Sequence, residues 1–331
     1  MKTQSIFAIL LIVSSVFGWW DGGHMITVEV AKQEILAKDP ALYQKIEKYV
    51  TILNPLCDAR SQTFVQAASW ADDIKDPAMN FWDKWHFFNK PINEEGLYVV
   101  LDQDSLNNNS ISALKRCIQE LQKNNTNPVN NPDNISVQQA IMMRYLIHIV
   151  GDMHQPLHNT NLFNYTFATS QGDLGGNKEN VLLLNGTSMV LHYYFDSGAL
   201  RLANFSRPLS QEQEQQVTDF AASFRAQYPR SFFNERINIT LPEIWAQESY
   251  EIAVRDIYPY LKLTNQVTPQ WDDLQYEMIK QQIAIGGYRL ADLLTTVFNP
   301  PVPPTPAPQN STNITSSNST SSIKLLRKSN V

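Results

Sequence analysis

The chain has 331 residues, of which 43% are hydrophobic and 18% are charged, and its formal net charge is −6. This length allows a large core and permits one large domain or two smaller ones. The acidic balance argues against a broad electrostatic surface for nucleic acid, so any polyanion would have to be bound locally, by metal charge rather than by lysine and arginine.

Residues 1–18 have the pattern of a secretory signal peptide. Lys2 supplies the positive start, residues 6–13 form an apolar core, and residues 16–18 provide a small-residue cleavage site. The alternative, a membrane anchor, is disfavoured because the apolar core is too short to span a bilayer. The sequence therefore predicts export.

Asn-x-Ser/Thr sites support export independently. There are ten, beginning at Asn108, Asn124, Asn134, Asn164, Asn185, Asn204, Asn238, Asn310, Asn313 and Asn318. Cys57 and Cys117 are the only cysteines, so at most one intramolecular disulfide bond is available. A single bridge suits an exported protein, and two unpaired buried thiols are the alternative.

The rest of the pattern up to Asn299 is mostly helical. Periodicity and capping residues predict helices over residues 25–37, from Asp39-Pro40 onward, and over 64–73, 110–123, 136–152, 192–203, 211–228, 241–262 and 271–297. Residues 181–190 favour a short hairpin around Asn185-Gly186, and residues 171–177 form a glycine-containing turn. Gly286-Gly287 in the last helix indicates close packing against another helix. The predicted fold class is all-α with a small β-hairpin.

From Asn299 the composition becomes proline-rich and then rich in serine, threonine and asparagine. This composition predicts a disordered, glycosylated tail over residues 299–331. The last nine residues contain three cations and few apolar side chains. They can therefore form neither a transmembrane helix nor a glycolipid-anchor signal.

One short stretch, residues 148–158, holds three of the six histidines of the chain. His148 and Asp152 are four residues apart, so they face the same way on the helix predicted over residues 136–152. Pro156 should end that helix near His154, and His158 would return from the following turn. The pattern is typical of a metal site built on a helix end and its exit loop.

Further candidate ligands lie in separate clusters: residues 19–24, the pair Asp72 and His86, and the pair His192 and Asp196. His192 and Asp196 repeat the spacing of His148 and Asp152. Zinc prefers imidazole nitrogen and carboxylate oxygen, usually four ligands, with one position open to water in a catalytic site. Either His/Asp pair alone would more often be a surface hydrogen bond, but the two together favour metal binding.

At these residues the sequence resembles a known family, the class I zinc nucleases. These are secreted single-strand nucleases and 3′-nucleotidases of moulds, plants and protozoa. The matching motifs are Trp19-Trp20-Asp21-Gly22-Gly23-His24, Ala68-Ser69-Trp70-Ala71-Asp72, Trp85-His86-Phe87, the stretch 148–158, Gly175-Gly176-Asn177 and Leu191-His192-x-x-x-Asp196. The resemblance implies one mainly helical domain over residues 19–298, of the zinc phospholipase C/nuclease-like fold, with three Zn²⁺ ions.

The resemblance also assigns the ligands. Asp72, His86, His148 and Asp152 would bind one zinc, and His158, His192 and Asp196 a second. The third would be bound by the α-amino nitrogen and carbonyl oxygen of Trp19 and by His24, with Asp152 bridging to it. Trp19 must then be the first residue of the mature chain, because a peptide-bonded nitrogen is no ligand; Trp20 is the competing start.

Other roles follow from the same resemblance. Asp72 would both bind zinc and orient the attacking hydroxide, while Lys75, which replaces an arginine common in the family, would contact the phosphate. Phe87 matches the ring that stacks on the base, and Asn177, with Gly175 in its turn, would bind the base edge.

For Lys75 the alternative is a solvated lysine, and for Phe87 a core aromatic. Asn89 stands where some relatives have aspartate, so base preference cannot be transferred. His154 matches no ligand position and is expected to be structural.

The implied activity is cleavage of single-stranded DNA and RNA to 5′-nucleotides, together with removal of 3′-phosphates, by metal-activated water. The nearest alternative is a zinc phospholipase C, which ends the last ligand pair with glutamate where this chain has Asp196. A secreted glycoprotein with purely structural metals is a further alternative. We expect a monomer without a stable membrane anchor, extracellular or within the secretory–lysosomal pathway.

Overall fold

A computed structural model describes residues 19–75, 81–99, 106–126, 135–168 and 171–300. The predicted signal peptide and nearly all of the predicted tail lie outside these ranges. In the described ranges, no helix is long and apolar enough to cross a membrane.

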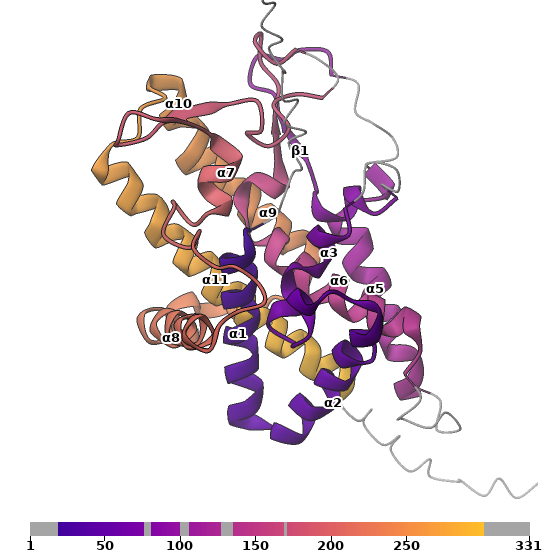
Figure 1. The fold of residues 1–331 in the computed structure, drawn as a ribbon. Helices are drawn as coiled ribbons and strands as arrows, with labels where there is room; N and C mark the ends of the chain where they lie inside the picture. Colours follow the sequence, from indigo (N-terminus) through magenta and orange to yellow (C-terminus); the bar gives the residue numbers. More distant parts are fainter. Residues whose placement is uncertain (1–18, 76–80, 100–105, 127–134, 169–170, 301–331) are drawn as a thin grey trace, which may run out of the picture. The chain divides into compact units, whose positions relative to one another are not determined.

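Helices dominate the chain (Figure 1), which confirms the predicted all-α class. The α-helices are α1 (Asp21–Lys38), α2 (Pro40–Thr51), α3 (Trp70–Asp73), α5 (Ser110–Thr126), α6 (Val137–Met153), α7 (Leu191–Asp196), α8 (Gln211–Gln227), α9 (Pro242–Ile252), α10 (Tyr258–Leu263) and α11 (Pro269–Phe298). The 3₁₀ turns are η1 (Asn54–Leu56), η2 (Ala59–Ser61), η3 (Gln66–Ser69), η4 (Asp83–His86), η5 (Pro156–Asn159) and η6 (Arg230–Asn238), and η7 (Ala253–Ile257) is a π-helical turn.

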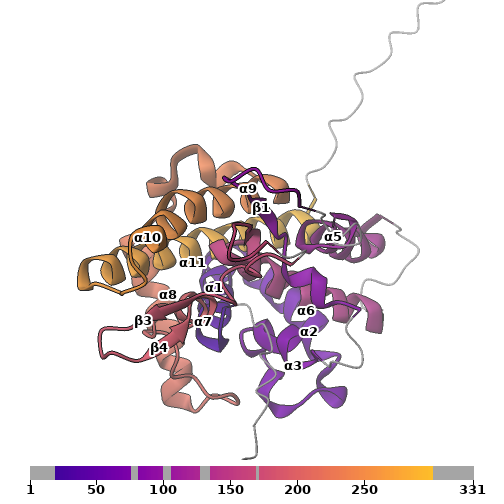
Figure 2. The ribbon, with the colours of Figure 1, turned by 90° about the horizontal axis from the view of Figure 1, so that it is seen from above.

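Three helices, α1, α6 and α11, pack against one another at the centre of the core. Helix α1 is buried on all sides from Gly22 to Ala31, and α6 is buried from Met143 to Met153. Figures 1 and 2 show α1 beside α11 in both views. A Cβ atom on Gly287 of α11 would lie 2.5 Å from Val30 Cβ of α1, so the predicted close packing at this glycine is present.

Helix α6 begins and ends where its sequence predicts. The Ser136 side chain accepts a hydrogen bond from Gln139 N, and the Gln139 side chain accepts one from Ser136 N, which completes a capping box. The helix ends at Met153, and His154 is its C-cap, because Pro156 cannot continue it. These two boundaries bring His148 and Asp152 onto the last turns of a buried helix.

Three predicted helices are shorter or more broken than expected. Residues 64–73 form η3 and the single turn α3, and residues 241–262 are divided by the π-helical turn η7 into α9 and α10. The helix predicted over 192–203 ends at Asp196, because Gly198, Ala199 and Leu200 all have positive φ. The helix therefore stops directly after its last candidate ligand.

Two pairs of strands complete the fold. The predicted hairpin consists of β3 (Asn180–Leu182) and β4 (Ser188–Val190), which pair antiparallel across Gly186, a residue with a φ of 80°. The sequence did not predict the parallel pair β1 (Lys90–Ile92) and β2 (Thr160–Leu162). This pair joins two segments 70 residues apart and lies directly after the loops that carry His86 and His158.

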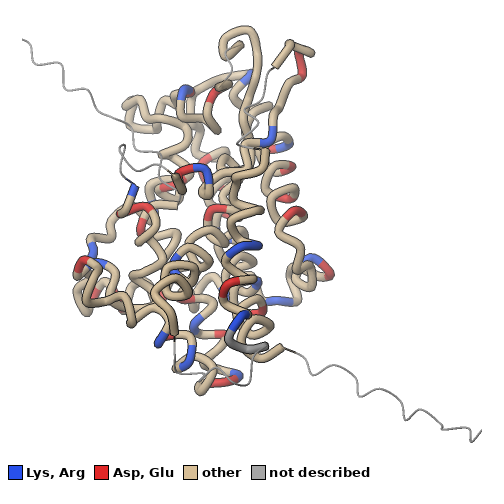
Figure 3. The backbone as a smooth tube through the Cα atoms, turned by 90° about the vertical axis from the view of Figure 1, so that its right-hand side faces the viewer, with Lys and Arg blue, Asp and Glu red and all other residues tan. Residues whose placement is uncertain are grey.

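Charged residues are mixed along the chain, with lysine and arginine interspersed among aspartate and glutamate (Figure 3). The two cysteines, for which the sequence left a bridge or free thiols open, are both free in the structure. Cys117 is buried on α5, and burial raises the pKa of its thiol well above its usual value. The disulfide bond is therefore absent from this structure.

Arg144 is a buried cation that connects α6 to the last turn of α2 and to the segment that follows it. Its guanidinium donates to Val50 O at 2.9 Å, Ser61 O at 2.9 Å and Asn54 Oδ1 at 3.0 Å. Loss of this group would leave buried acceptors without donors, at about 1–3 kcal/mol each. We expect Arg144→Gln to lower the free energy of unfolding by at least about 2 kcal/mol in urea titration. The exposed Arg116→Gln on α5 is the control, and equal stability of the two variants would contradict this role.

Candidate metal centre

Five histidines and three aspartates converge in the interior from six elements. The residues are His24 of α1, Asp72 of α3, His86 of η4, His148 and Asp152 of α6, His158 of η5, and His192 and Asp196 of α7. All eight side chains are buried. Among the described residues they form three groups whose ligand atoms lie within 4.8 Å of one another: His24, His148 and Asp152; Asp72, His86 and His148; and His158, His192 and Asp196.

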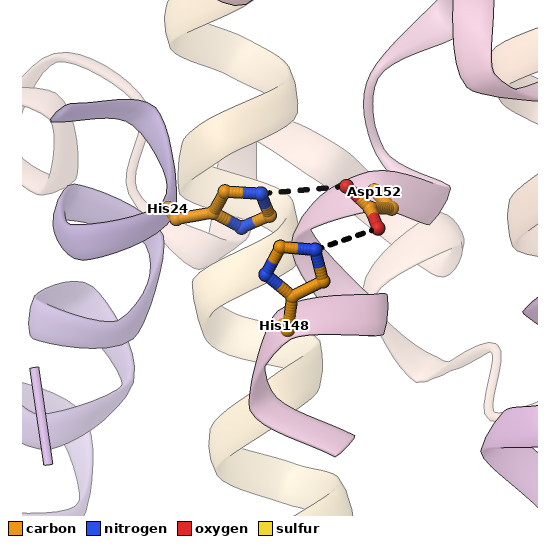
Figure 4. Close-up of side chains that lie close together, drawn as sticks. All are labelled: His24, His148 and Asp152. Carbon is orange, nitrogen blue, oxygen red and sulfur yellow. Dashed lines mark ion pairs between the residues drawn. The ribbon is translucent and has the colours of Figure 1, made fainter. Parts of the chain in front are cut away.

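The first group joins α1 to α6 (Figure 4). His24 Nε2 lies 3.4 Å from Asp152 Oδ1, and His148 Nε2 lies 3.0 Å from Asp152 Oδ2. The two imidazole rings stack with their centroids 3.9 Å apart. Gly151 makes this approach possible, because a Cβ atom there would lie 2.6 Å from His24 Nδ1.

The second group shares His148 with the first. His148 Nε2 lies 2.8 Å from His86 Nδ1, and both nitrogens lie 3.0 Å from Asp152 Oδ2. Asp72 Oδ1 lies 3.5 Å from His148 Nε2 and 3.6 Å from His86 Nδ1. Asp152 therefore stands between the first two groups, with one carboxylate oxygen toward each.

The third group lies at the other end of the same cluster. His192 Nε2 is 3.2 Å from His158 Nε2 and 3.4 Å from Asp196 Oδ2, and His158 Nε2 is 3.8 Å from Asp196 Oδ1. The second carboxylate oxygen of Asp196 accepts a hydrogen bond of 2.7 Å from Gln155 Nε2. This leaves the Oδ2 atom, which faces His192, without a hydrogen-bond donor.

Backbone carbonyls set the orientation of three of the imidazoles. The Nδ1 atoms of His148, His158 and His192 lie 2.6 Å from Ala68 O, 2.8 Å from His86 O and 2.6 Å from Gly175 O. A carbonyl only accepts, so each Nδ1 carries the proton and each Nε2 presents a lone pair to the cluster. This is the arrangement by which proteins orient histidine ligands to metals.

The unpaired atoms of the cluster fit a cation. Both ring nitrogens of His24, Asp152 Oδ1 and Asp196 Oδ2 are buried without a hydrogen-bond partner. Two lone pairs also face each other at the Nε2 atoms of His158 and His192, 3.2 Å apart. Ligands at about 2.0–2.1 Å from one tetrahedral zinc are separated by about 3.3 Å. The donor types, burial and spacing therefore suit zinc.

Burial and neighbouring charges shift the pKa values of these ligands in different directions. Burial lowers the pKa of His86 and of His158 to about 4, so both are neutral near pH 7. Burial opposes ionisation of Asp72, but Lys75 and the neighbouring imidazoles outweigh it and hold the pKa of this carboxyl below its usual range. Burial raises the pKa of Asp196 well above its usual range, and a bound cation would reverse this effect.

Lys75 and Phe87 lie at the edge of the cluster. Lys75 Nζ forms an ion pair of 2.6 Å with Asp72 Oδ1 and lies 5.8 Å from the centre of the Phe87 ring. The Phe87 ring stacks on His158 with centroids 4.7 Å apart. Phe87 is only half-buried, which disfavours the alternative that this ring is part of the hydrophobic core.

A cavity of about 150 Å³ adjoins Phe87, and two of the four predicted substrate-binding residues, Phe87 and Asn89, line it. It is lined by Asp83, Lys84, Phe87, Phe88, Asn89 and Asn108. Asn177 is not among these residues: its Nδ2 donates to Leu174 O, and its buried Oδ1 has no partner. Gly175 contributes its carbonyl to His192 and does not line the cavity.

The N-terminal tryptophans lie against the cluster. Trp19 is fully buried, and its indole N–H donates to Gly151 O at 3.0 Å. Trp20 N donates to Asp196 O at 2.9 Å. The start of the described chain is thus held between the first group, on α6, and the third group, on α7.

His154 lies outside the three groups. Its Nδ1 donates to Val150 O at 2.7 Å, and its Nε2 lies 3.0 Å from Arg289 Nη1 of α11. Burial, and then the charge of Arg289, lower the pKa of His154 to about 3, so the neutral ring accepts from the guanidinium. These contacts give it the packing position that the sequence analysis expected.

Several residues that support the ligands were not predicted from the sequence. Gln155 donates to Asp196 and also accepts from Leu157 N at 2.6 Å, so it connects the third group to η5. Gly151 makes room for His24, and Asp173 organises the glycine turn that faces His192. The sequence could have indicated them by position, because Gln155 and Gly151 lie within residues 148–158 and Asp173 lies near Gly175-Gly176.

Comparisons with known proteins identify the family of this chain. The family model described as S1/P1 Nuclease matches residues 19–299. The chain is similar to Nuclease S1 of Aspergillus oryzae, with 24% identity over 89% of this chain and 96% of that protein. It is similar to Nuclease P1 of Penicillium citrinum, with 26% identity over 84% and 97%, and to Endonuclease 3 of Arabidopsis thaliana, with 22% identity over 90% and 95%. The chain belongs to the S1/P1 nuclease family, whose members are nucleic-acid hydrolases.

Proposed function

We propose that this protein is a secreted, zinc-dependent hydrolase that cleaves single-stranded DNA and RNA to 5′-nucleotides and removes 3′-phosphates. The buried cluster of five histidines and three aspartates with unpaired ligand atoms carries the proposal. The relatives named nuclease and endonuclease support it, and they favour it over the phospholipase C alternative.

Three zinc ions would have ligands in this cluster. Asp72, His86, His148 and Asp152 would hold one, and His158, His192 and Asp196 a second. His24, Asp152 and the amino nitrogen and carbonyl oxygen of Trp19 would hold the third. Bound zinc lowers the pKa of a coordinated water and neutralises charge on the leaving oxygen.

The protein's own side chains would bind and orient the substrate. Asp72 would orient the attacking hydroxide, and Lys75, beside it, would attract the phosphate as a point charge. Phe87 lines a cavity where an unpaired base would stack, which favours single strands over duplexes. Asn89, which lines this cavity, would contact the base edge. Asn177 lies outside the cavity, so its proposed contact with the base rests on the family resemblance alone.

The amino terminus is part of the proposal. A free α-amine on Trp19 requires removal of residues 1–18, which have the signal-peptide pattern, and the family match begins at the same residue. We further propose that residues 19–298 form the nuclease domain and residues 299–331 a tail. The mature protein would be a glycosylated monomer without a membrane anchor, outside the cell or in the secretory–lysosomal pathway.

The purified mature protein should hydrolyse single-stranded DNA and RNA and release phosphate from 3′-nucleotides. Chelation should abolish these activities, because the substrate phosphate would lose its counter-charge, and added zinc should restore them. Phosphatidylcholine serves as the control substrate. Zinc-loaded protein without nucleolysis would contradict the proposal, and cleavage of phosphatidylcholine alone would favour the phospholipase alternative.

One additional residue before Trp19 should lower activity and zinc content together. A peptide-bonded nitrogen cannot coordinate, and loss of one ligand should weaken the N-terminal zinc at least about tenfold. The measurement is metal content and turnover of a variant beginning with Gly-Trp19, compared with a variant extended by one residue at Val331. Unchanged zinc content and rate would exclude Trp19 as a ligand.

Gly151→Ala should expel His24 from the cluster, because its Cβ would lie 2.6 Å from His24 Nδ1. Alanine is favoured over glycine inside helices by about 1 kcal/mol, so propensity alone would stabilise α6. We therefore expect the zinc content to fall from three ions per chain toward two. Because a higher helix propensity would not remove zinc, this loss distinguishes the steric effect from the effect on the helix. A variant with full zinc content would show that α1 can shift without loss of the site.

A further inference from the structure

A carboxylate outside the ligand set, Asp173, lies at the centre of the turn at residues 171–177. Asp173 is fully buried, and its side chain accepts four hydrogen bonds. Leu162 N donates to Oδ1 at 2.6 Å and Gly175 N at 3.1 Å, while Gly176 N donates to Oδ2 at 2.7 Å. The fourth donor is the hydroxyl of Tyr258, 2.6 Å from Oδ2.

This carboxylate holds a backbone that is not stable by itself. Gly172, Leu174, Gly175 and Gly176 all have positive φ, between 57° and 83°. For Leu174 that conformation is unfavourable and persists only when surrounding contacts impose it. Successive N–H groups in such a turn form a concave anion site, and here the Asp173 carboxylate fills it.

The turn contacts His192 of the third group and packs against the residue that precedes His158. Gly175 O accepts the proton of His192 Nδ1 at 2.6 Å, and Gly176 O accepts from His192 N at 3.3 Å. A Cβ atom on Gly175 would lie 2.3 Å from Leu157 O, so the turn also presses against η5 one residue before His158. The position of this turn therefore sets the tautomer and orientation of His192.

Tyr258, which is distant in the sequence, contributes to the position of this turn through its hydrogen bond to Asp173. It is the first residue of α10 and directly follows the π-helical turn η7. Its side chain is buried, and burial together with Asp173 raises the pKa of the phenol well above its usual range. The hydroxyl is thus a permanent donor to the carboxylate.

We propose that Asp173 and Tyr258 are positioning residues for the metal group formed by His158, His192 and Asp196. The pair fixes the turn that presents Gly175 O to His192, and thereby directs His192 Nε2 to the ligand position. The inference rests on the proposed zinc-dependent function. It adds to the site two residues that belong to neither the proposed metal ligands nor the proposed substrate contacts. Through Tyr258 it also makes the orientation of His192 depend on α10.

The test compares Tyr258→Phe with Tyr260→Phe in the mature full-length protein. Tyr258→Phe removes one hydroxyl and keeps the ring, while Tyr260, two residues away on the same helix, donates its hydroxyl to Gln266 O at 2.6 Å instead. Zinc affinity is measured by chelator competition on the zinc-loaded protein. We expect one of three zinc ions to bind about 10- to 100-fold more weakly in Tyr258→Phe, and none in Tyr260→Phe.

A second readout needs neither metal nor activity. In metal-free protein, amide hydrogen exchange of the peptide over residues 171–178 should accelerate at least about tenfold in Tyr258→Phe and remain unchanged in Tyr260→Phe, because a local opening becomes easier. Asp173→Asn should show both effects more strongly, since its amide group sets N–H donors against the N–H groups of the turn.

The outcomes separate this inference from the function on which it rests. Wild-type protein that binds zinc, together with unchanged zinc affinity and exchange in Tyr258→Phe, would overturn the positioning role alone. Equal weakening of all three zinc ions would also overturn it, because that result indicates general destabilisation. Wild-type protein that binds no zinc would overturn the proposed function, and the metal-positioning role with it.

Discussion

The structure depends on the burial of three carboxylates among five imidazoles in a core that excludes water. Ionised groups are costly to transfer from water, and the cost is recovered only by close opposite charge or hydrogen bonds. Lys75 supplies one positive charge, at the edge, and several inner ligand atoms have no hydrogen-bond partner. Bound metal cations would offset this cost. The buried ligand cluster, which is unfavourable in the metal-free protein, therefore favours metal binding.

The arrangement of the central helices follows from this constraint. His24, His148 and Asp152 meet only because α1 and α6 approach closely at Gly151, and α1 in turn packs closely on α11 at Gly287. Outside the ligands, backbone carbonyls and a few buried side chains orient each imidazole. The site is therefore supported by most of the chain rather than by one loop.

The local nature of helix signals explains which elements differ from prediction. Capping residues marked the ends of α6 correctly, since Ser136, Gln139 and Pro156 act within their own neighbourhood. The end of α7 depends on three consecutive residues with positive φ, two of them not glycine, which local propensity cannot indicate. The pairing of β1 with β2 joins segments 70 residues apart, so its partners have no local signature.

The sequence by itself determined the helical class, the boundaries of most long helices and the candidate ligand residues, because periodicity, caps and repeated His-x-x-x-Asp spacing are local patterns. The start of α1 was the exception, because the helix begins at Asp21, four residues before the predicted start, and so includes His24. Motif resemblance also grouped those ligands. Tertiary structure alone decided the distances among them, the tautomers set by distant carbonyls, and the separation of Asn177 from the cavity beside Phe87. It also decided the link from Tyr258 through Asp173 to His192, since these contacts join residues 85 and 17 positions apart and arise only when the helices pack.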